Sequence, residues 1–539
     1  MIIAPEFLFG QVVLRDSLVT WQHHRFELND DFSMKTASND DSDIEEVTFD
    51  GKVIENDLIR LVVLPEYGAR VISFFYKPTG HEYLYQSECG SAYGIGEGNF
   101  YYDWLMVYGG IFPTLPEPEH GKSWLLPWDY SVIENSSEKV IVRMELTDDT
   151  QYNGAPGGFN NGITGITCQV DITVYNDASI WDFDVKLINN RSENINYEYW
   201  TCTTMTPGTD PGNTSSPLTS EIVIPVEEYE AGWSPNSWIG GNGSIGQMSE
   251  IEILSEWSNM GIAYAKDLKD QFWGVINHEN EEGIFRISEN VETSGMKLWT
   301  WGQDNVDNDM FDYSNGGADN YIELWAGVSD RFFSDAVLTP LEQKAWTESY
   351  VPSIGMAVVD EMNEFAGIGI SWDNEFQMLK YQLNTFHANA SYDLEIYLDD
   401  YSMQIENQLI QFSPLGLERT IDLSNLSLIS GSHKVIVNLI DDQDNAILMA
   451  EINFENNPVL GLDEIEDEFS VRLINHRELS ISSQTRENYD FQLINLNGQL
   501  LQYGSSDSQN TTLKVSNGGL YIVQVTVQGS AFSKKIWVN

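Results

Sequence analysis

Apolar and polar residues alternate along most of the chain in short runs with a period of two. Clear examples are 60–64 (RLVVL), 139–146 (KVIVRMEL), 166–175 (ITCQVDITVY) and 180–188 (IWDFDVKLI), which lie between Gly, Asn, Asp and Pro residues. This alternation is typical of β-strands, whereas the periodicity of amphipathic helices is nearly absent. Because the strands recur about every ten residues, the sequence predicts an all-β protein built of sandwiches or barrels.

The same pattern divides the chain into blocks. Residues 11–352 form one long run of strands, and residues 353–455 form a smaller block of the size of an immunoglobulin-like β-sandwich. Residues 456–468 (NNPVLGLDEIEDE) are charged and carry Pro and Gly, as a linker does, and residues 469–539 form a third β module. Residues 1–10 (MIIAPEFLFG) are apolar but short, so we interpret them as the remnant of a signal peptide or of an expression vector.

The charge of the chain restricts its partners. The sequence has 83 acidic and 27 basic residues among 539, a net charge of −56. Such a protein repels nucleic acids and anionic membrane surfaces, and no apolar run is long enough for a transmembrane helix. We therefore expect no nucleic-acid partner and no membrane insertion. The three cysteines do not predict a disulfide framework.

The last block carries a specific pattern of short strands. Its segments are 491–504 (FQLINLNGQLLQYG), 513–527 (LKVSNGGLYIVQVTV) and 532–539 (FSKKIWVN). Asn497-Gly498 is a type I′ hairpin signal, because both central residues of that turn need positive φ. In order and spacing the three segments resemble the C-terminal sorting domain of the type IX secretion system. The resemblance implies that the type IX machinery is a partner and that the protein is secreted or held at the cell surface.

Four segments of the first block resemble galactose mutarotase-like proteins. They are 64–85 (LPEYGARVISFFYKPTGHEYLY), 109–128 (GGIFPTLPEPEHGKSWLLPW), 187–208 (LINNRSENINYEYWTCTTMTPG) and 296–333 (MKLWTWGQDNVDNDMFDYSNGGADNYIELWAGVSDRFF). The resemblance covers roughly residues 50–352 and is nearest to uncharacterised families of that fold. It implies a large β-supersandwich, followed here by two small β-sandwich modules.

The resemblance also implies sugar-binding and catalytic positions. Arg70 would point toward a sugar cleft, and His120 would donate to a sugar oxygen beside Trp124. Glu198 stands at or beside the place of the family's second His, so simple galactose mutarotation is in doubt. Tyr197 and Tyr199 flank this Glu as candidate substrate-binding residues.

Glu323 matches the family's catalytic base on a late strand. It alternates with Ile322 and Leu324, so its side chain leaves the sheet on the opposite face from theirs. Trp299, Trp301 and Trp325 are the expected substrate-binding aromatics around it. We expect a partly desolvated, unpaired carboxylate suited to proton transfer.

These residues favour a carbohydrate-active enzyme that works by general acid/base proton transfer on an oligo- or polysaccharide, as in polysaccharide degradation. Epimerisation and lyase- or dehydratase-type elimination both fit, and isomerase or lyase chemistry is favoured over hydrolysis. Two alternatives stay open: a non-catalytic carbohydrate-binding protein, and a glycoside hydrolase using Glu198 and Glu323.

No cofactor is expected. The acidic loop 304–319 carries oxygen ligands of the kind that calcium prefers but lacks the twelve-residue calcium-loop pattern, so a solvated loop is favoured over a calcium site. His23, His24 and His278 do not have metal-ligand spacing.

Overall fold

The computed structural model describes residues 10–28, 34–38, 40, 42–90, 109–116, 121, 123–150, 163–212, 215–307, 319–426, 428, 430–456, 469–475, 478–483, 488–495, 499–515, 519–527 and 530–538. The chain divides into two compact units. One contains residues up to 372 with 379–421 and 433–454, and the other contains 373–378, 422–432 and 455–539. Within the described residues, no helix is both long enough and apolar enough to span a membrane.

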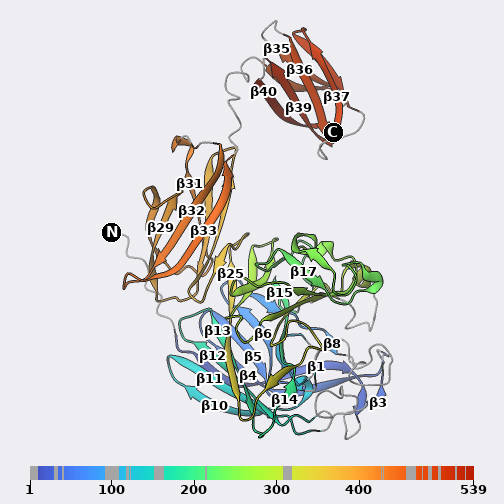
Figure 1. The fold of residues 1–539 in the computed structure, drawn as a ribbon, viewed down its shortest axis with the longest axis vertical. Coiled ribbons are helices and arrows are strands. Elements are labelled where there is room, and N and C mark those ends of the chain that lie inside the picture. The colour runs from blue at the N-terminus through green and yellow to red at the C-terminus, as the bar shows by residue number, and fades with distance from the viewer. Residues whose placement is uncertain are drawn as a thin grey trace. The chain divides into compact units, whose positions relative to one another are not determined.

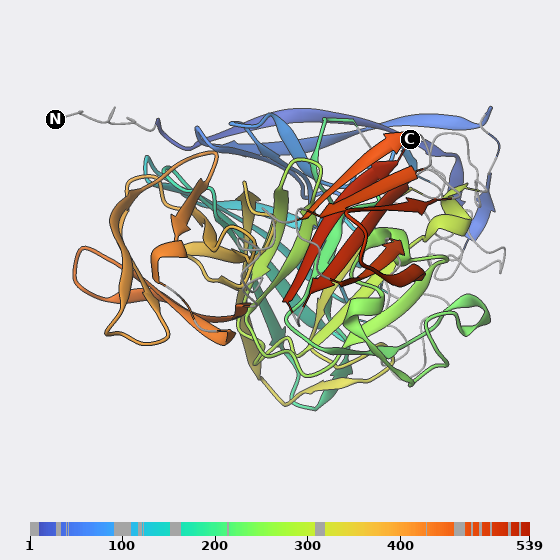
Figure 2. The ribbon, with the colours of Figure 1, turned by 90° about the horizontal axis from the view of Figure 1, so that it is seen from above.

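The first layer of the large domain is a 13-stranded sheet, mostly antiparallel, whose order along the sheet differs from the order along the chain. In sheet order its strands are β18 (Ile245–Gln247), β17 (Glu228–Ala231), β19 (Gly261–Ala265), β22 (Gly295–Thr300), β23 (Ile322–Gly327), β15 (Trp200–Thr209), β7 (His81–Leu84), β6 (Arg70–Tyr76), β5 (Ile59–Leu64), β4 (Ile44–Glu55), β1 (Val13–His24) and β8 (Cys89–Gly90), with β9 (Ile111–Thr114) paired to β15 and β6. Figure 2 shows the long strands β1 and β4 (blue) side by side along one edge.

The second layer is an 8-stranded antiparallel sheet. Its strands are β10 (Asp129–Asn135), β11 (Lys139–Thr147), β12 (Ile166–Tyr175), β13 (Trp181–Asn189), β25 (Gln343–Ile354), β21 (Glu282–Ile287), β20 (Phe272–Asn277) and β16 (Glu221–Val223), in sheet order. The main hydrophobic core lies between the two layers and takes residues from both, such as Val71 and Leu324 from the first and Val170 and Phe183 from the second. Figure 1 shows β10 to β13 beside β4 to β6.

Burial differs between the strands of the large domain. Every second residue of β13 is buried and those between are partly exposed, as in a strand with one solvated face. In contrast, β15 and β23 are buried at every residue, and β22 at all but Trp299. These three strands are adjacent in the first sheet. Their second face is therefore covered by side chains as well, as it is in β20 and β21 of the second sheet.

Two smaller sandwiches follow, each built of two sheets. The first has the sheets β26 (Glu361–Met362), β27 (Ala366–Asp373), β28 (Met378–Thr385), β31 (Leu417–Asp422) and β30 (Gln404–Gln411), β29 (Ser391–Leu398), β32 (Gly431–Ile440), β33 (Ala446–Asn456). The second has the sheets β34 (Phe469–Asn475), β35 (Glu478–Ser483), β38 (Asn510–Lys514) and β37 (Leu500–Ser506), β36 (Tyr489–Asn495), β39 (Gly519–Val527), β40 (Ser530–Val538).

Other described elements are short. They are the pairs β2 (Phe26–Leu28) with β3 (Met34–Ala37) and β14 (Ile195–Tyr197) with β24 (Ala336–Leu338), the helix α2 (Gln303–Asp307) and the 3₁₀ turns at Ser123–Leu125, Pro235–Ser237, Met248–Glu250, Leu254–Glu256 and Ser424–Leu426. The predicted fold class, an all-β protein with a large supersandwich and two small sandwiches, is confirmed. The hairpin signal Asn497-Gly498, Gly518 and the predicted linker beyond Asn456 lie outside the described residues.

Candidate functional site

Side chains on β15 alternate between the two faces of the first sheet. Thr201 and Thr203 bond to Glu348 and Tyr350 of the second sheet, so they point into the space between the layers. Trp200, Cys202 and Thr204 therefore lie on the opposite face. We call this opposite face, which looks away from the second sheet, the outer face.

Cross-strand register aligns a row of side chains across the outer face. Phe112 pairs with Cys202, Cys202 with Trp325, Trp325 with Lys297, and Lys297 with Tyr264. A second row lies two residues away along the strands, where Thr204 pairs with Glu323 and Glu323 with Trp299. The two rows bring the carboxylate of Glu323, the ammonium of Lys297 and several aromatic rings together on neighbouring strands.

Glu323 is at the centre of the most polar part of this face. Its carboxylate accepts hydrogen bonds from Lys297 Nζ (2.9 Å), Trp325 Nε1 (2.8 Å) and Tyr321 Oη (3.2 Å). The Lys297 ammonium also lies 4.1 Å from the centre of the Trp325 ring, in cation–π contact. Together with Trp299 these residues form what we call the Glu323 site.

An aromatic cluster borders the Glu323 site. Tyr85 and Tyr321 stack with ring centres 3.9 Å apart, and Trp299 meets Trp301 edge to face at 4.7 Å. Burial raises the pKa of Tyr321 well above its usual value, and the Glu323 carboxylate raises it further. Tyr321 therefore stays a hydrogen-bond donor near neutral pH. Trp299 is the partly exposed ring of the cluster, and its flat apolar surface with a polar edge suits the face of a sugar.

Arg70 begins β6 directly after a tight turn. Gly68 has φ 73°, and a Cβ there would lie 2.0 Å from the carbonyl oxygen of Trp124, so only glycine fits. Arg70 is fully buried and donates to the carbonyl oxygen of Gly109 at 2.5 Å. Its guanidinium lies 3.8 Å from the centre of the Phe112 ring, which places it at the end of the first row. The predicted role of Arg70 in binding a sugar stays a prediction.

Glu198 is a second buried acid. It is fully buried, and burial raises the pKa of its carboxyl to about 7, against the smaller lowering effect of the Trp200 indole that donates to it at 3.2 Å. Glu198 lies two residues before β15 begins at Trp200. The alternative in which Glu198 and Glu323 form one hydrolytic pair stays a prediction.

Two expectations need correction. Tyr197 and Tyr199 are fully buried and belong to the core between the layers, where Tyr199 packs edge to face on Trp346 at 5.1 Å. Tyr199 also bonds to Thr201, which points between the layers. Glu323 is also not an unpaired acid, since Lys297 forms an ion pair with it.

The remaining predicted residues are placed as follows. Trp124 is buried against Tyr67, beside Arg70, with ring centres 6.0 Å apart. Trp301 and Trp325 are buried near Glu323. His120 lies outside the described residues, so its predicted role stays a prediction.

Lys297 is the residue that sequence reasoning missed. The segment MKLWTW already pointed to it. Lys297, Trp299 and Trp301 follow one another at intervals of two residues, so their side chains lie on the same face of the strand. A lysine on a face of tryptophans needs an anionic partner if it is buried. Glu323 on the next strand supplies that partner.

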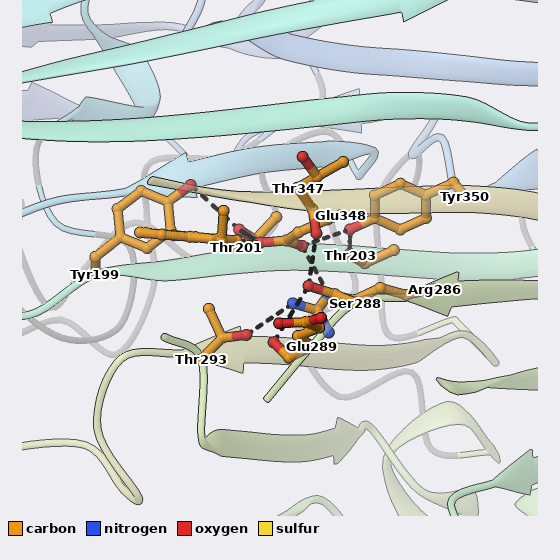
Figure 3. A network of polar contacts seen from close by, with 11 residues as sticks. Tyr199, Thr201, Thr203, Arg286, Ser288, Glu289, Thr293, Thr347, Glu348 and Tyr350 are labelled. Carbon is orange, nitrogen blue, oxygen red and sulfur yellow. Dashed lines mark hydrogen bonds and ion pairs between the residues drawn. The ribbon is translucent and has the colours of Figure 1, made fainter. Parts of the chain in front are cut away.

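A buried polar network lies on the other side of β15, between the layers (Figure 3). The Arg286 guanidinium donates to Glu348 at 2.8 Å, and both side chains are at most 1% exposed. Glu348 also accepts from Thr201 at 2.7 Å, and Thr293 accepts from Arg286 at 2.9 Å. The network joins β15 to β21 and β25, so it fixes the strand whose opposite face carries Trp200 and Cys202.

A metal site is not apparent in the described part of the chain. No group of three or more His, Cys, Asp or Glu side chains there is close enough together to hold an ion. Asp319 accepts a hydrogen bond from Tyr85 at 2.8 Å, whereas Asp309 and Asp312 of the acidic loop lie outside the described residues. A calcium site in this loop stays untested.

Comparison with known proteins gives likenesses of fold. No protein-family model and no curated protein matches the chain. Among solved structures, a TPR-domain containing protein from Parabacteroides distasonis matches with a TM-score of 0.50 and 16% identity, over 64% of this chain and 55% of the other. This chain thus spans about half the length of that protein, and at this identity the likeness concerns the fold alone.

Solved galactose mutarotase-like proteins are also among the matches. The one from Clostridium acetobutylicum has a TM-score of 0.39 and 11% identity, over 56% of this chain and 96% of the other. The one from Lactobacillus casei has a TM-score of 0.39 and 11% identity, over 56% of this chain and 99% of the other.

Proposed function

We propose that the protein is a carbohydrate-active enzyme that transfers protons at a sugar bound on the outer face, with Glu323 as the base. The observation that carries the proposal is the Glu323 site itself: a carboxylate held by Lys297 and Tyr321 beside the partly exposed ring of Trp299. The aromatic ring provides a surface for a sugar, and the carboxylate provides a proton acceptor. The galactose mutarotase-like matches agree with a sugar as ligand.

The donors around Glu323 favour isomerase or lyase chemistry over hydrolysis. In both reactions a base removes a proton from a sugar carbon or hydroxyl, and a cation or neutral acid stabilises the charge that develops on oxygen. Lys297 and Tyr321 are suited to that second task.

The test is a screen for turnover on monosaccharides and on oligosaccharides from plant and algal glycans. Absorbance of unsaturated uronates detects elimination, proton NMR detects epimerisation, and new reducing ends detect hydrolysis. Turnover should be lost in Glu323→Gln and kept in Asp171→Asn, a control carboxylate paired to Arg143 at 2.7 Å on the second sheet.

Calorimetry on Glu323→Gln then separates an enzyme from a lectin. The amide keeps the size of the side chain and one acceptor oxygen, so affinity for the sugar should stay within about tenfold. A wild type that binds sugars but turns over none of them would make the protein a carbohydrate-binding protein, and one that binds none would remove the carbohydrate proposal altogether.

We also propose that residues 469–539 act as a type IX sorting module and that the protein is secreted or held at the cell surface. The support is the order of the three C-terminal segments and their arrangement as a separate small sandwich with its own core.

A further inference from the structure

A cavity of about 440 Å³ lies at the β17–β19 end of the first sheet. Its polar lining comes mainly from Glu230, Lys266, Asp267, Asn290, Asp330 and Arg331. We call it the Arg331 cavity. Its volume is within the range of small-molecule sites, roughly 300 to 1,000 Å³.

The Arg331 cavity opens on the same outer face as the Glu323 site. Tyr229 belongs to the core between the layers, so its neighbour Glu230 points outward. Glu230 pairs across the strands with Tyr264, which pairs with Lys297 of the Glu323 site. Tyr264 and Trp325 are thus two strands apart, or about 10 Å.

One short segment forms a wall shared by the two places. Arg331 lines the cavity, while the next residue, Phe332, packs edge to face on Trp325 with ring centres 5.5 Å apart. The Phe332 ring also lies 5.5 Å from Lys297 Nζ and 6.2 Å from the Tyr264 ring. A ligand in the cavity and a sugar at the Glu323 site would therefore be neighbours on opposite sides of Phe332.

The polar groups of the cavity are arranged to bind a polyhydroxylated ligand. The two oxygens of Glu230 hold two cations, Arg331 at 2.8 Å and Lys266 at 3.1 Å. Both cations remain partly exposed, at 42% and 37% of their side chains, so their orientation is fixed while donor groups still reach the cavity. With the amide of Asn290 and the carboxylate of Asp330, the lining offers fixed donors and acceptors at several angles.

We infer that the Arg331 cavity is a subsite for a further sugar unit, so that the substrate is an oligosaccharide chain and not a free monosaccharide. The inference rests on the proposed function, because it assumes that a sugar occupies the Glu323 site. A sugar is favoured over a simple anion, since the cations of the cavity are balanced by Glu230 and accompanied by Asp267 and Asp330.

The test measures how affinity depends on chain length. Galactose, xylose and mannuronate, each as the monosaccharide and as the β-1,4-linked tetrasaccharide, are titrated into Glu323→Gln protein by calorimetry. At least one tetrasaccharide should bind about tenfold more tightly than its monosaccharide, the gain expected from a few charge-assisted hydrogen bonds. Adding Arg331→Ala should remove that gain.

The matched control is Arg15→Ala, on the same sheet, where Arg15 bonds to Glu55 at 3.1 Å and is 48% exposed, against 42% for Arg331. This variant should keep the gain. A gain that survives Arg331→Ala, or equal affinity for the two chain lengths in every series, overturns the subsite. Turnover of a monosaccharide by the wild type with no gain in any series would leave the proposed function standing and remove the subsite. If the gain is lost in Arg331→Ala but the wild type turns over no sugar, the subsite stands and the proposed enzymatic function is removed.

Discussion

At the scale of the residue, the ion pair between Lys297 and Glu323 dominates the outer face. Both side chains are at most 10% exposed, so neither charge has bulk water to replace its partner. A buried pair of this kind contributes little when compared with apolar residues of similar volume, but removing one partner leaves the other charge buried and unmatched.

We therefore predict that Lys297→Met lowers the free energy of unfolding by about 3–5 kcal/mol. The double variant Lys297→Met/Glu323→Gln should recover most of this loss, because the glutamine carries no charge. Urea unfolding of the wild type, both single variants and the double variant measures the coupling between the two residues. Additive effects, with no recovery in the double variant, would mean that the two side chains do not depend on each other.

Glu198 makes a prediction about pH. Burial raises the pKa of its carboxyl from 4.5 to about 7 in the folded protein. Between these values the folded state holds the proton that the unfolded state has lost, so the contribution of Glu198 to stability is fully present below pH 4.5 and is lost as pH rises through 7. We expect the wild type to lose about 3 kcal/mol across this window relative to Glu198→Gln, which does not titrate.

The measurement is urea unfolding of both proteins at intervals between pH 4.5 and 8. Using the difference between them cancels the titration of other groups. Parallel pH profiles would show that Glu198 titrates as an ordinary exposed carboxyl.

At the scale of the element, β15 contributes side chains both to the polar network between the two layers and to the outer face. Thr201 and Thr203 bond into the network of Glu348, Tyr350 and Arg286, while Trp200, Cys202 and Thr204 lie on the outer face. A substitution that weakens the hydrogen bonds of that network should therefore also destabilise the outer face.

We predict that Arg286→Met destabilises the protein by about 3–5 kcal/mol, because Glu348 stays buried without its cation. Hydrogen exchange should show faster loss of protection in residues 200–209 than in β11 and β12. The control is Arg143→Met, since Arg143 bonds to Asp171 at 2.7 Å with its side chain 34% exposed and should change stability by about 1 kcal/mol or less. Equal effects of the two variants would contradict a special role of the buried network.

The sequence predicted elements better than it predicted the site. Strand 166–175 was located to the residue and 180–188 to within one, because strict alternation marks a strand with one solvated face. Alternation also placed Glu323 on the correct face. It could not reveal Lys297 as the partner of Glu323, because that contact depends on the register between β22 and β23.

The same limit explains the two misplaced tyrosines. Tyr197 and Tyr199 were grouped with Glu198 because they are near it along the chain, but neighbours in a strand point to opposite faces. The Arg331 cavity draws on segments around residues 230, 266, 290 and 330 that share no motif.

At the scale of the whole molecule, the C-terminal module has the features of an independent folding unit. All strands of its two sheets come from residues 469–538, and its core contains residues of both sheets, such as Leu479 and Val523. The large domain has a separate core between its own two layers. Stability and activity of the one should therefore not depend on the other.

We predict that a protein ending at Glu468 folds with an unchanged unfolding temperature of the large domain and keeps any sugar turnover of the full chain, but is no longer exported by a type IX secretion system. The physical reason is that the Glu323 site and the Arg331 cavity are built from residues 85–332, whereas the proposed sorting signal lies in 469–539. Calorimetric unfolding, the sugar assay and fractionation of a bacterium that has this secretion system measure the three properties. As the converse control, residues 469–539 fused behind a folded reporter with a signal peptide should carry that reporter out of the cell. Export of the truncated protein, or retention of the fused reporter in the periplasm, would show that the signal lies elsewhere in the chain.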